Sequence, residues 1–170
     1  MNAPIKLLLI AFALCRRGIA AMEFALVAPV GVVLLLGISE TGTAMLIDRK
    51  VTRASYIGAD LVAQETTMSD EKVADVFTAM EAILQPFPAG AHLRVTSVWL
   101  NPDTSATEVD WSEARNGDVD SGDYELPDGL IVQDGDSVIV THIVYNYSPL
   151  YDDFIFGDIT LEDKSYMKPR

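Results

Sequence analysis

The order of apolar and polar residues gives the N-terminal third of the chain one long apolar run. Phe24–Ser39 contains no charged residue, and extending the run to Ile47 adds only Glu40. At about 1.5 Å per residue, such a run is long enough for a tilted helix that crosses a membrane once. Beyond Ile47 apolar residues continue at helical spacing, which predicts that the same helix extends as a stalk to about residue 65.

A second helix is predicted to begin at Ser69, which can cap it. Asp70 and Glu71 follow, where carboxylates favour the positive end of a helix dipole. Pro86 and Pro88 should end the helix. Its predicted apolar face consists of Val73, Val76, Phe77, Met80, Ile83 and Leu84.

After these prolines the apolar period changes from 3.6 to 2, which indicates strands. Leu93, Val95 and Trp99 should share one face of the first strand, and aromatic residues at this period usually line the buried face of a sheet. Together with the second helix, the strands predict an α+β fold with a roughly four-stranded antiparallel sheet. The expected strand segments are Leu93–Leu100, a short strand with Val109 and Trp111 on one face, Ser137–Tyr147, and a strand that begins at Ile159–Glu162.

Charge is distributed unevenly along the chain. From Ala54 onward there are 22 acidic side chains against six basic ones, a balance of −16, within a whole-chain net charge of −13. A domain this acidic would be repelled by phosphate, so no nucleic-acid partner is expected. Lys6, Arg16 and Arg17 before the apolar run are matched by three basic residues just after it, so the positive-inside rule gives no orientation.

Arg16–Val30 reads RRGIAAMEFALVAPV, and Glu23 is the fifth residue after Gly18. A carboxylate in an apolar membrane segment costs free energy, about 2.5–3.5 kcal/mol at the bilayer centre. Its presence therefore indicates a functional role. The string resembles the processing region of the TadE-like family, the minor pseudopilins of tight-adherence (Flp) pili. The endings Tyr145–Leu150 (YNYSPL) and Ser165–Arg170 (SYMKPR) are similar to those of the same family.

The resemblance implies a domain map and an orientation. Residues 1–18 would be a leader peptide, residues 19–47 a transmembrane helix, and residues 66–170 an acidic domain outside the cytoplasm. The expected location is the bacterial inner membrane, crossed once, with the C-terminal domain in the periplasm and incorporation in the pilus left open.

The same resemblance implies roles for individual residues. A prepilin peptidase would cut between Gly18 and Ile19, and Arg16 and Arg17 would set membrane topology. Assembly would depend on Glu23, with Phe24 and Pro29 beside it in the helix. Expected partners are the peptidase, other Tad pilins and pseudopilins, the inner-membrane assembly platform and the membrane itself.

Other interpretations of the N-terminus remain open. Leu7–Leu14, which follows Lys6, could be the apolar region of a secretory signal, with Ala11–Ala13 at its end as an A-x-A-like cleavage site. The whole segment could also be an uncleaved signal anchor. Either would suit a signal-anchored periplasmic binding or sensor domain that never enters a filament. Cys15 is the only cysteine, so a chain cut after Gly18 would contain no disulfide.

The sequence contains no nucleophile motif, phosphate loop or dinucleotide fingerprint, and neither enzymatic activity nor a cofactor is expected. Two histidines without a mature cysteine argue against zinc. One weak calcium candidate remains, because alternating acidic residues near glycines can wrap that ion, although the spacing lacks the EF-hand glycine and terminal glutamate. Its residues are Asp118, Asp120 and Asp123.

Overall fold

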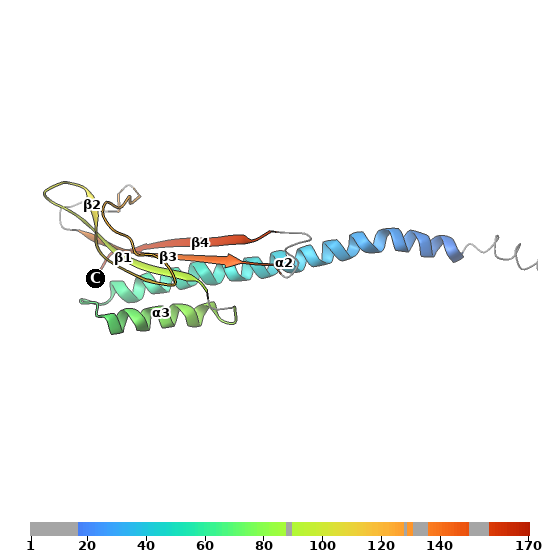
Figure 1. The fold of residues 1–170 in the computed structure, drawn as a ribbon, viewed down its shortest axis with the longest axis horizontal. Helices are drawn as coiled ribbons and strands as arrows, with labels where there is room; N and C mark the ends of the chain where they lie inside the picture. Colours follow the sequence, from blue (N-terminus) through green and yellow to red (C-terminus); the bar gives the residue numbers. More distant parts are fainter. Residues whose placement is uncertain (1–16, 88–89, 128, 131–135, 150–156) are drawn as a thin grey trace, which may run out of the picture. The chain divides into compact units, whose positions relative to one another are not determined.

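The computed structural model describes residues 17–87, 90–127, 129–130, 136–149 and 157–170. The chain divides into two compact units, Met1–Thr41 and Gly42–Arg170. The described elements follow the order α2, α3, β1, β2, β3 and β4 (Figure 1). This is the α+β arrangement predicted from the sequence: a long apolar helix, a second helix and a four-stranded antiparallel sheet.

Helix α2 (Arg17–Ala63) extends without interruption through 47 residues. Pro29 lies inside it, at the cost of one backbone hydrogen bond. The backbone N–H groups of Gln64 and Glu65 still donate to carbonyls of the last turn, those of Asp60 and Val62. The predicted extension beyond the apolar run to about residue 65 is therefore confirmed.

Helix α3 (Asp70–Leu84) begins where its capping residue predicts. Ser69 has an extended backbone, and its side chain accepts a hydrogen bond from the backbone N–H of Lys72 at 3.4 Å. Asp70 and Glu71 occupy the first turn, where they stabilise the helix dipole. The buried residues are those of the predicted face except that Ile83 is only partly buried: Val73, Val76, Phe77, Met80 and Leu84.

The sheet has the strand order β2-β1-β3-β4, and every neighbouring pair is antiparallel. Its strands are β1 (His92–Leu100), β2 (Thr107–Arg115), β3 (Ser137–Tyr147) and β4 (Ile159–Met167). The bounds of β3 are those predicted. Strand β4 continues five residues past the predicted segment, because alternation persists through its charged residues and each of them still pairs with β3.

A β-bulge in the β1–β2 pair contradicts one prediction. Trp111 lies opposite Ser97, but the next pair joins Val109 to Val98, so Asp110 is the extra residue on β2. Because Ser97 and Val98 are consecutive, their partners point to opposite faces of the sheet. The prediction that Val109 and Trp111 share one face is wrong, since simple alternation does not anticipate a bulge.

Both faces of the sheet carry apolar side chains, but the main core lies between the sheet and the two helices within Gly42–Arg170. Trp111 and Tyr147 pack against this core, and Tyr145 belongs to it, whereas Trp99 does not. A smaller cluster on the opposite face contains Val98, Val138 and Val140. The main core includes Ile47, Val51, Ala54, Val62, Phe77, Met80, Leu93, Val95, Ile139 and Ile143.

Four further hydrogen bonds join α2 to other parts of the second unit. Ser55 of α2 donates its hydroxyl to the Thr141 carbonyl of β3 at 3.2 Å. The ammonium group of Lys50 donates to the carbonyls of Ile83 and Gln85 at the end of α3, at 3.0 and 2.8 Å. The backbone N–H of Arg170 donates to the carbonyl of Ala63 at 3.0 Å, which satisfies one of the open carbonyls at the end of α2.

Candidate functional site: the N-terminal helix and the polar face of the sheet

The first part of α2 exposes apolar side chains along its length. Leu26, Leu35 and Ile38 are 79%, 68% and 72% exposed, and other large apolar residues between them are similarly open. Soluble proteins rarely leave so large an apolar surface uncovered. By length and composition, Gly18–Ala63 is able to cross a membrane, which fits a single-pass membrane anchor.

The predicted processing residues lie at the beginning of this helix. A Cβ at Gly18 would meet nothing within 4 Å among the described residues beyond its chain neighbours and its own helix backbone, and Ile19 is 56% exposed. Glu23 is exposed and follows Ile19 by four residues, which places both on one face of the helix, about one turn apart. Phe24 is 73% exposed beside Glu23.

Of the two predicted topology residues, Arg17 is the first residue of α2. Arg16, like the rest of the predicted leader before it, lies outside the described residues.

Glu23, directly before the apolar run, and Glu40, within it, differ in their surroundings. Glu40 is buried, with 8% exposure, and takes part in an interaction. Glu23 is exposed and has neither a hydrogen-bond nor an ion-pair partner among residues 17–87 or in the other described segments. Glu23 is therefore the carboxylate that is open to a partner from outside the chain.

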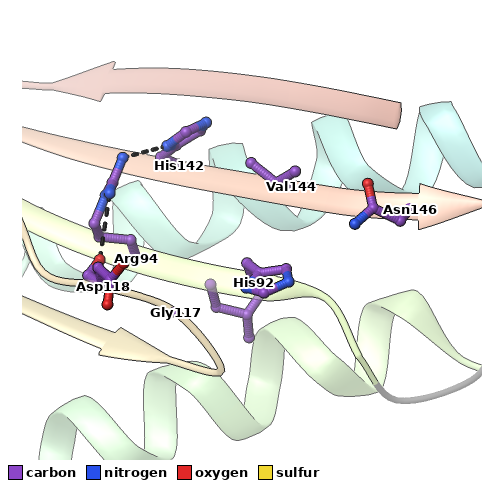
Figure 2. A pocket seen from close by; sticks show the side chains of 8 residues that line it. His92, Arg94, Gly117, Asp118, His142, Val144 and Asn146 are labelled. Carbon is purple, nitrogen blue, oxygen red and sulfur yellow. Dashed lines mark hydrogen bonds between the residues drawn. The ribbon is translucent and has the colours of Figure 1, made fainter. Parts of the chain in front are cut away.

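A second group of polar side chains lies on the face of the sheet away from the main core. Figure 2 shows Arg94 of β1 reaching across to His142 of β3, with 2.6 Å between Nη2 and Nδ1. The other ring nitrogen of His142, Nε2, lies 2.8 Å from the carboxylate of Glu162 on β4. Because arginine can only donate, Nδ1 accepts and Nε2 carries the hydrogen, which makes His142 a neutral ring with both nitrogens engaged.

Burial lowers the pKa of His142 below its usual value, and the hydrogen bond to Glu162 opposes part of that shift. Nearby Arg94 lowers the pKa further, because a second positive charge beside the guanidinium is unfavourable. The ring therefore remains neutral around pH 7.

Arg94 also holds the segment that follows β2. Its Nη1 donates to the Asp118 carbonyl at 3.3 Å (Figure 2), and its Nε lies 3.0 Å from the carboxylate of Asp120. That second contact is an ion pair without hydrogen-bond alignment, since the Nε–H is not directed at the oxygen. The Asp120 carboxylate instead accepts a hydrogen bond from the Thr96 hydroxyl at 2.9 Å. The backbone N–H of Asp120 donates to the Ser112 hydroxyl at 3.0 Å.

These contacts bear on the calcium candidate. Asp120 faces a guanidinium and a hydroxyl, whereas Asp118 and Asp123 are exposed, and Asp123 pairs with Glu108 through a backbone bridge. The described residues contain no group of three acidic or histidine side chains placed to hold a metal ion. Calcium binding by this loop stays a prediction. In the structure the positive charge beside Asp120 is the guanidinium of Arg94.

A shallow cavity of about 280 Å³ opens beside the Arg94–His142 pair. Its walls come from β1, β3 and the Gly117–Asp118 turn, and include His92, Val144 and Asn146 (Figure 2). Because Arg94 contacts both His142 on β3 and the Asp118 carbonyl, this arrangement fixes the loop after β2 to the sheet.

One comparison with known proteins identifies a family. The family model described as TadE-like protein matches residues 18–60. The chain thus carries a TadE-like segment. No curated protein and no solved structure matches the chain.

The TadE-like segment begins at Gly18 and contains Glu23, Phe24 and Pro29, so it covers the motif on which the resemblance was based. The resemblance is confirmed, and the family suggests involvement in the Tad pilus system, with partners among pilus components and the membrane. The segment ends before α3, so the sheet and its polar cluster lie outside the matched region.

Sequence reasoning placed His142 in a strand but did not find its partners. Arg94 and Glu162 are 48 and 20 residues away along the chain, and only the register of β1, β3 and β4 brings them together. The sequence did contain one relevant pattern, namely polar residues at alternate positions of otherwise apolar strands. That signal indicates a common face, but it does not give the strand order.

Proposed function

We propose that this chain is a minor pseudopilin of the tight-adherence pilus, cleaved after Gly18 and used in initiating, capping or supporting the filament. The proposal is carried by one observation: a TadE-like segment that starts at Gly18 and, five residues later on an exposed apolar helix, presents the Glu23 carboxylate without a partner among the described residues. The chain would cross the inner membrane once and expose its acidic domain to the periplasm. Its role would be structural, without catalysis and without a cofactor.

Cleavage would be performed by a prepilin peptidase. A glycine before the scissile bond offers no side chain to obstruct a narrow active site, and nothing in the described chain crowds Gly18. Once the leader is removed, Ile19 carries a free amino group one helical turn from Glu23.

Glu23 would act in assembly. The amino group of a neighbouring subunit can approach its carboxylate at the membrane interface, where low dielectric strengthens attraction and offsets part of the cost of desolvation. Phe24 and Pro29 would contribute to the contact surface of the same helix. The pairing would set the axial register between subunits.

The decisive experiment is to determine the mature N-terminus by mass spectrometry, using protein from cells with and without the prepilin peptidase. We expect a chain beginning at Ile19 only where the peptidase is present. Gly18→Leu should keep the leader attached. Gly31→Leu is the matched control, because Gly31 lies in the same helix and a Cβ there would likewise meet nothing within 4 Å in the described chain outside its own stretch of helix.

The assembly role has its own test. Glu23→Ala should insert and be processed normally, while recovery of Tad partners and piliation fall sharply; Glu23→Gln separates the loss of charge from the loss of shape. A mature chain beginning at Leu14 would indicate a secretory signal peptidase and favour the signal-anchored binding domain instead. Undiminished piliation in Glu23→Ala would remove the proposed role of that residue.

A further inference from the structure

Within the second unit, α2 carries an exposed stripe on the side away from its buried residues. Met45 and Tyr56 are 61% and 59% exposed, and Arg49 and Arg53 between them are exposed as well. Neither arginine has a side-chain partner in the part of the chain that the structure describes. We call Met45, Arg49, Arg53 and Tyr56 the basic stripe.

The basic stripe is unusual for this molecule. Beyond Arg53 the chain has 22 acidic and only six basic side chains, and Lys50, the other basic residue here, is engaged by the carbonyls that end α3. Arginine, tyrosine and methionine are enriched at the centres of protein–protein interfaces. Two unpaired arginines flanked by exposed methionine and tyrosine therefore indicate a contact surface for an acidic partner.

Helix α3 presents the complementary charge. Glu71 and Asp75 are exposed on the side opposite its buried face, and neither has a side-chain partner among the described residues. We call these two residues the acidic stripe. Glu81, which lies toward the sheet, is by contrast paired with Arg115 at 2.9 Å.

The spacing of the two stripes matches. Arg49 and Arg53 are four residues apart, as are Glu71 and Asp75, and four residues of helix rise about 6 Å. We propose that the basic stripe of one copy of this chain binds the acidic stripe of a second copy. Such a contact joins two different surfaces, so each copy keeps one stripe free for a further neighbour and the contact can repeat along an array.

A second copy fits these charges better than a lipid surface does. Anionic headgroups would attract Arg49 and Arg53 but would repel the acidic residues of the same unit, including the acidic stripe. A second copy supplies carboxylates at the required interval. The contact concerns residues 42–170 alone, so it does not depend on cleavage after Gly18.

The test uses the full chain carrying two different tags, co-expressed in a host without other pilus proteins and solubilised in mild detergent. Recovery of one tagged copy with the other is measured at low and high salt. The variants are Arg49→Glu with Arg53→Glu, Glu71→Arg with Asp75→Arg, and all four together. Lys164→Glu with Asp110→Arg is the matched control, because both residues are exposed and belong to neither stripe.

Each double reversal should lower self-recovery at least about fivefold, because it places like charges opposite one another, and mixing the two double variants should restore it. The fourfold variant should return to at least half of the wild-type recovery, since its stripes are exchanged. The control variant should behave as wild type, and recovery should fall with salt. Circular dichroism of each purified variant establishes that it is folded.

Three results would overturn the proposal. Self-recovery that is unaffected by either reversal would assign any association to other surfaces, such as the apolar part of α2. A loss on reversing the arginines but not the acids would identify another acidic occupant, a membrane surface or a different protein. A folded fourfold variant that fails to recover would show that the two stripes do not meet.

Discussion

The two ends of α2 place similar apolar side chains in opposite situations. Between Ile19 and Ile38 the large apolar side chains are exposed, except that Leu36 is half-buried. By contrast, Ile47 and Val51, nine and thirteen residues beyond Ile38, are fully buried in the core of the second unit. The type of the individual side chain does not explain this difference, because isoleucine and valine occur in both regions, although charged residues are more frequent in the second. The difference lies in what covers them: the sheet and α3 cover the second region, and the first fits an anchor that a membrane would cover.

The largest effect on folding should come from shortening the chain from its N-terminus, either before or after the part of α2 that belongs to the core. A chain of residues 42–170 keeps Ile47, Val51 and Ala54, and should be soluble and unfold cooperatively. A chain of residues 66–170 loses that whole side of the core and should not fold, because each large core residue contributes about 2–5 kcal/mol. Thermal circular dichroism of the two chains makes the comparison, and equal stability would mean that α2 is dispensable for the core.

Single substitutions sharpen the same contrast. Ile47→Ala removes a fully buried side chain and should lower the free energy of unfolding by about 2–5 kcal/mol. Leu35→Ala, at a position that is 68% exposed, should change it by no more than about 0.5 kcal/mol. The measurement is denaturant unfolding of the full chain in detergent, followed by tryptophan fluorescence. A large effect at Leu35 would place that residue in a packed environment.

Substituting two glycines of α2 should change the stability of the fold by smaller amounts and in opposite directions. A Cβ at Gly58 would lie 2.7 Å from the sulfur of Met80, which is fully buried, so Gly58→Ala should destabilise the fold by about 1–3 kcal/mol. Gly42→Ala meets nothing within 4 Å and should stabilise the helix by about 0.5–1 kcal/mol. Melting temperatures of the two variants should move in opposite directions from that of the wild type. A stabilising Gly58→Ala would indicate space beside Met80.

The smallest predicted effect concerns pH. The pKa of His142 is lowered in the folded state, so the unfolded chain binds a proton more readily, and this residue's contribution to stability is lost as pH falls through about 6.5 and below. His142→Gln can keep both hydrogen bonds without titrating. The difference in unfolding free energy between wild type and variant should therefore shrink or reverse on going from pH 7.5 to pH 5.5. A difference that does not vary with pH would mean that the ring is not held neutral.

Local signals in the sequence were sufficient for most of the fold. The cap at Ser69 and the prolines after Leu84 bound α3, and the alternating β-branched residues of Ser137–Tyr147 define β3. These features depend on neighbours within a few residues. The bulge at Asp110 and the strand order depend on pairing between distant segments, so alternation alone did not give them.

The candidate sites differ in the same respect: one depends on neighbours in the sequence, and the others depend on contacts between distant segments. Gly18 and Glu23 form a motif within six residues, and the family match covers it. Arg94, His142 and Glu162 come from three strands and meet only through their register. The basic stripe was also not predicted, because the burial of one side of α2 by the sheet and α3 decides which of its residues remain exposed.

The continuity of α2 has a mechanical consequence. One helix contains both the apolar segment and part of the core, so a pull applied where α2 enters the second unit reaches that core through the backbone hydrogen bonds of the helix. There Ser55 is bonded to β3, and Ala63 is bonded to Arg170, which follows β4. Within this unit β3 and β4 lie nearly along α2 (Figure 1), so a pull along the helix loads its contacts with β3 and with the end of the chain mainly in shear. Resistance to such a pull is set by the rate of unfolding rather than by equilibrium stability.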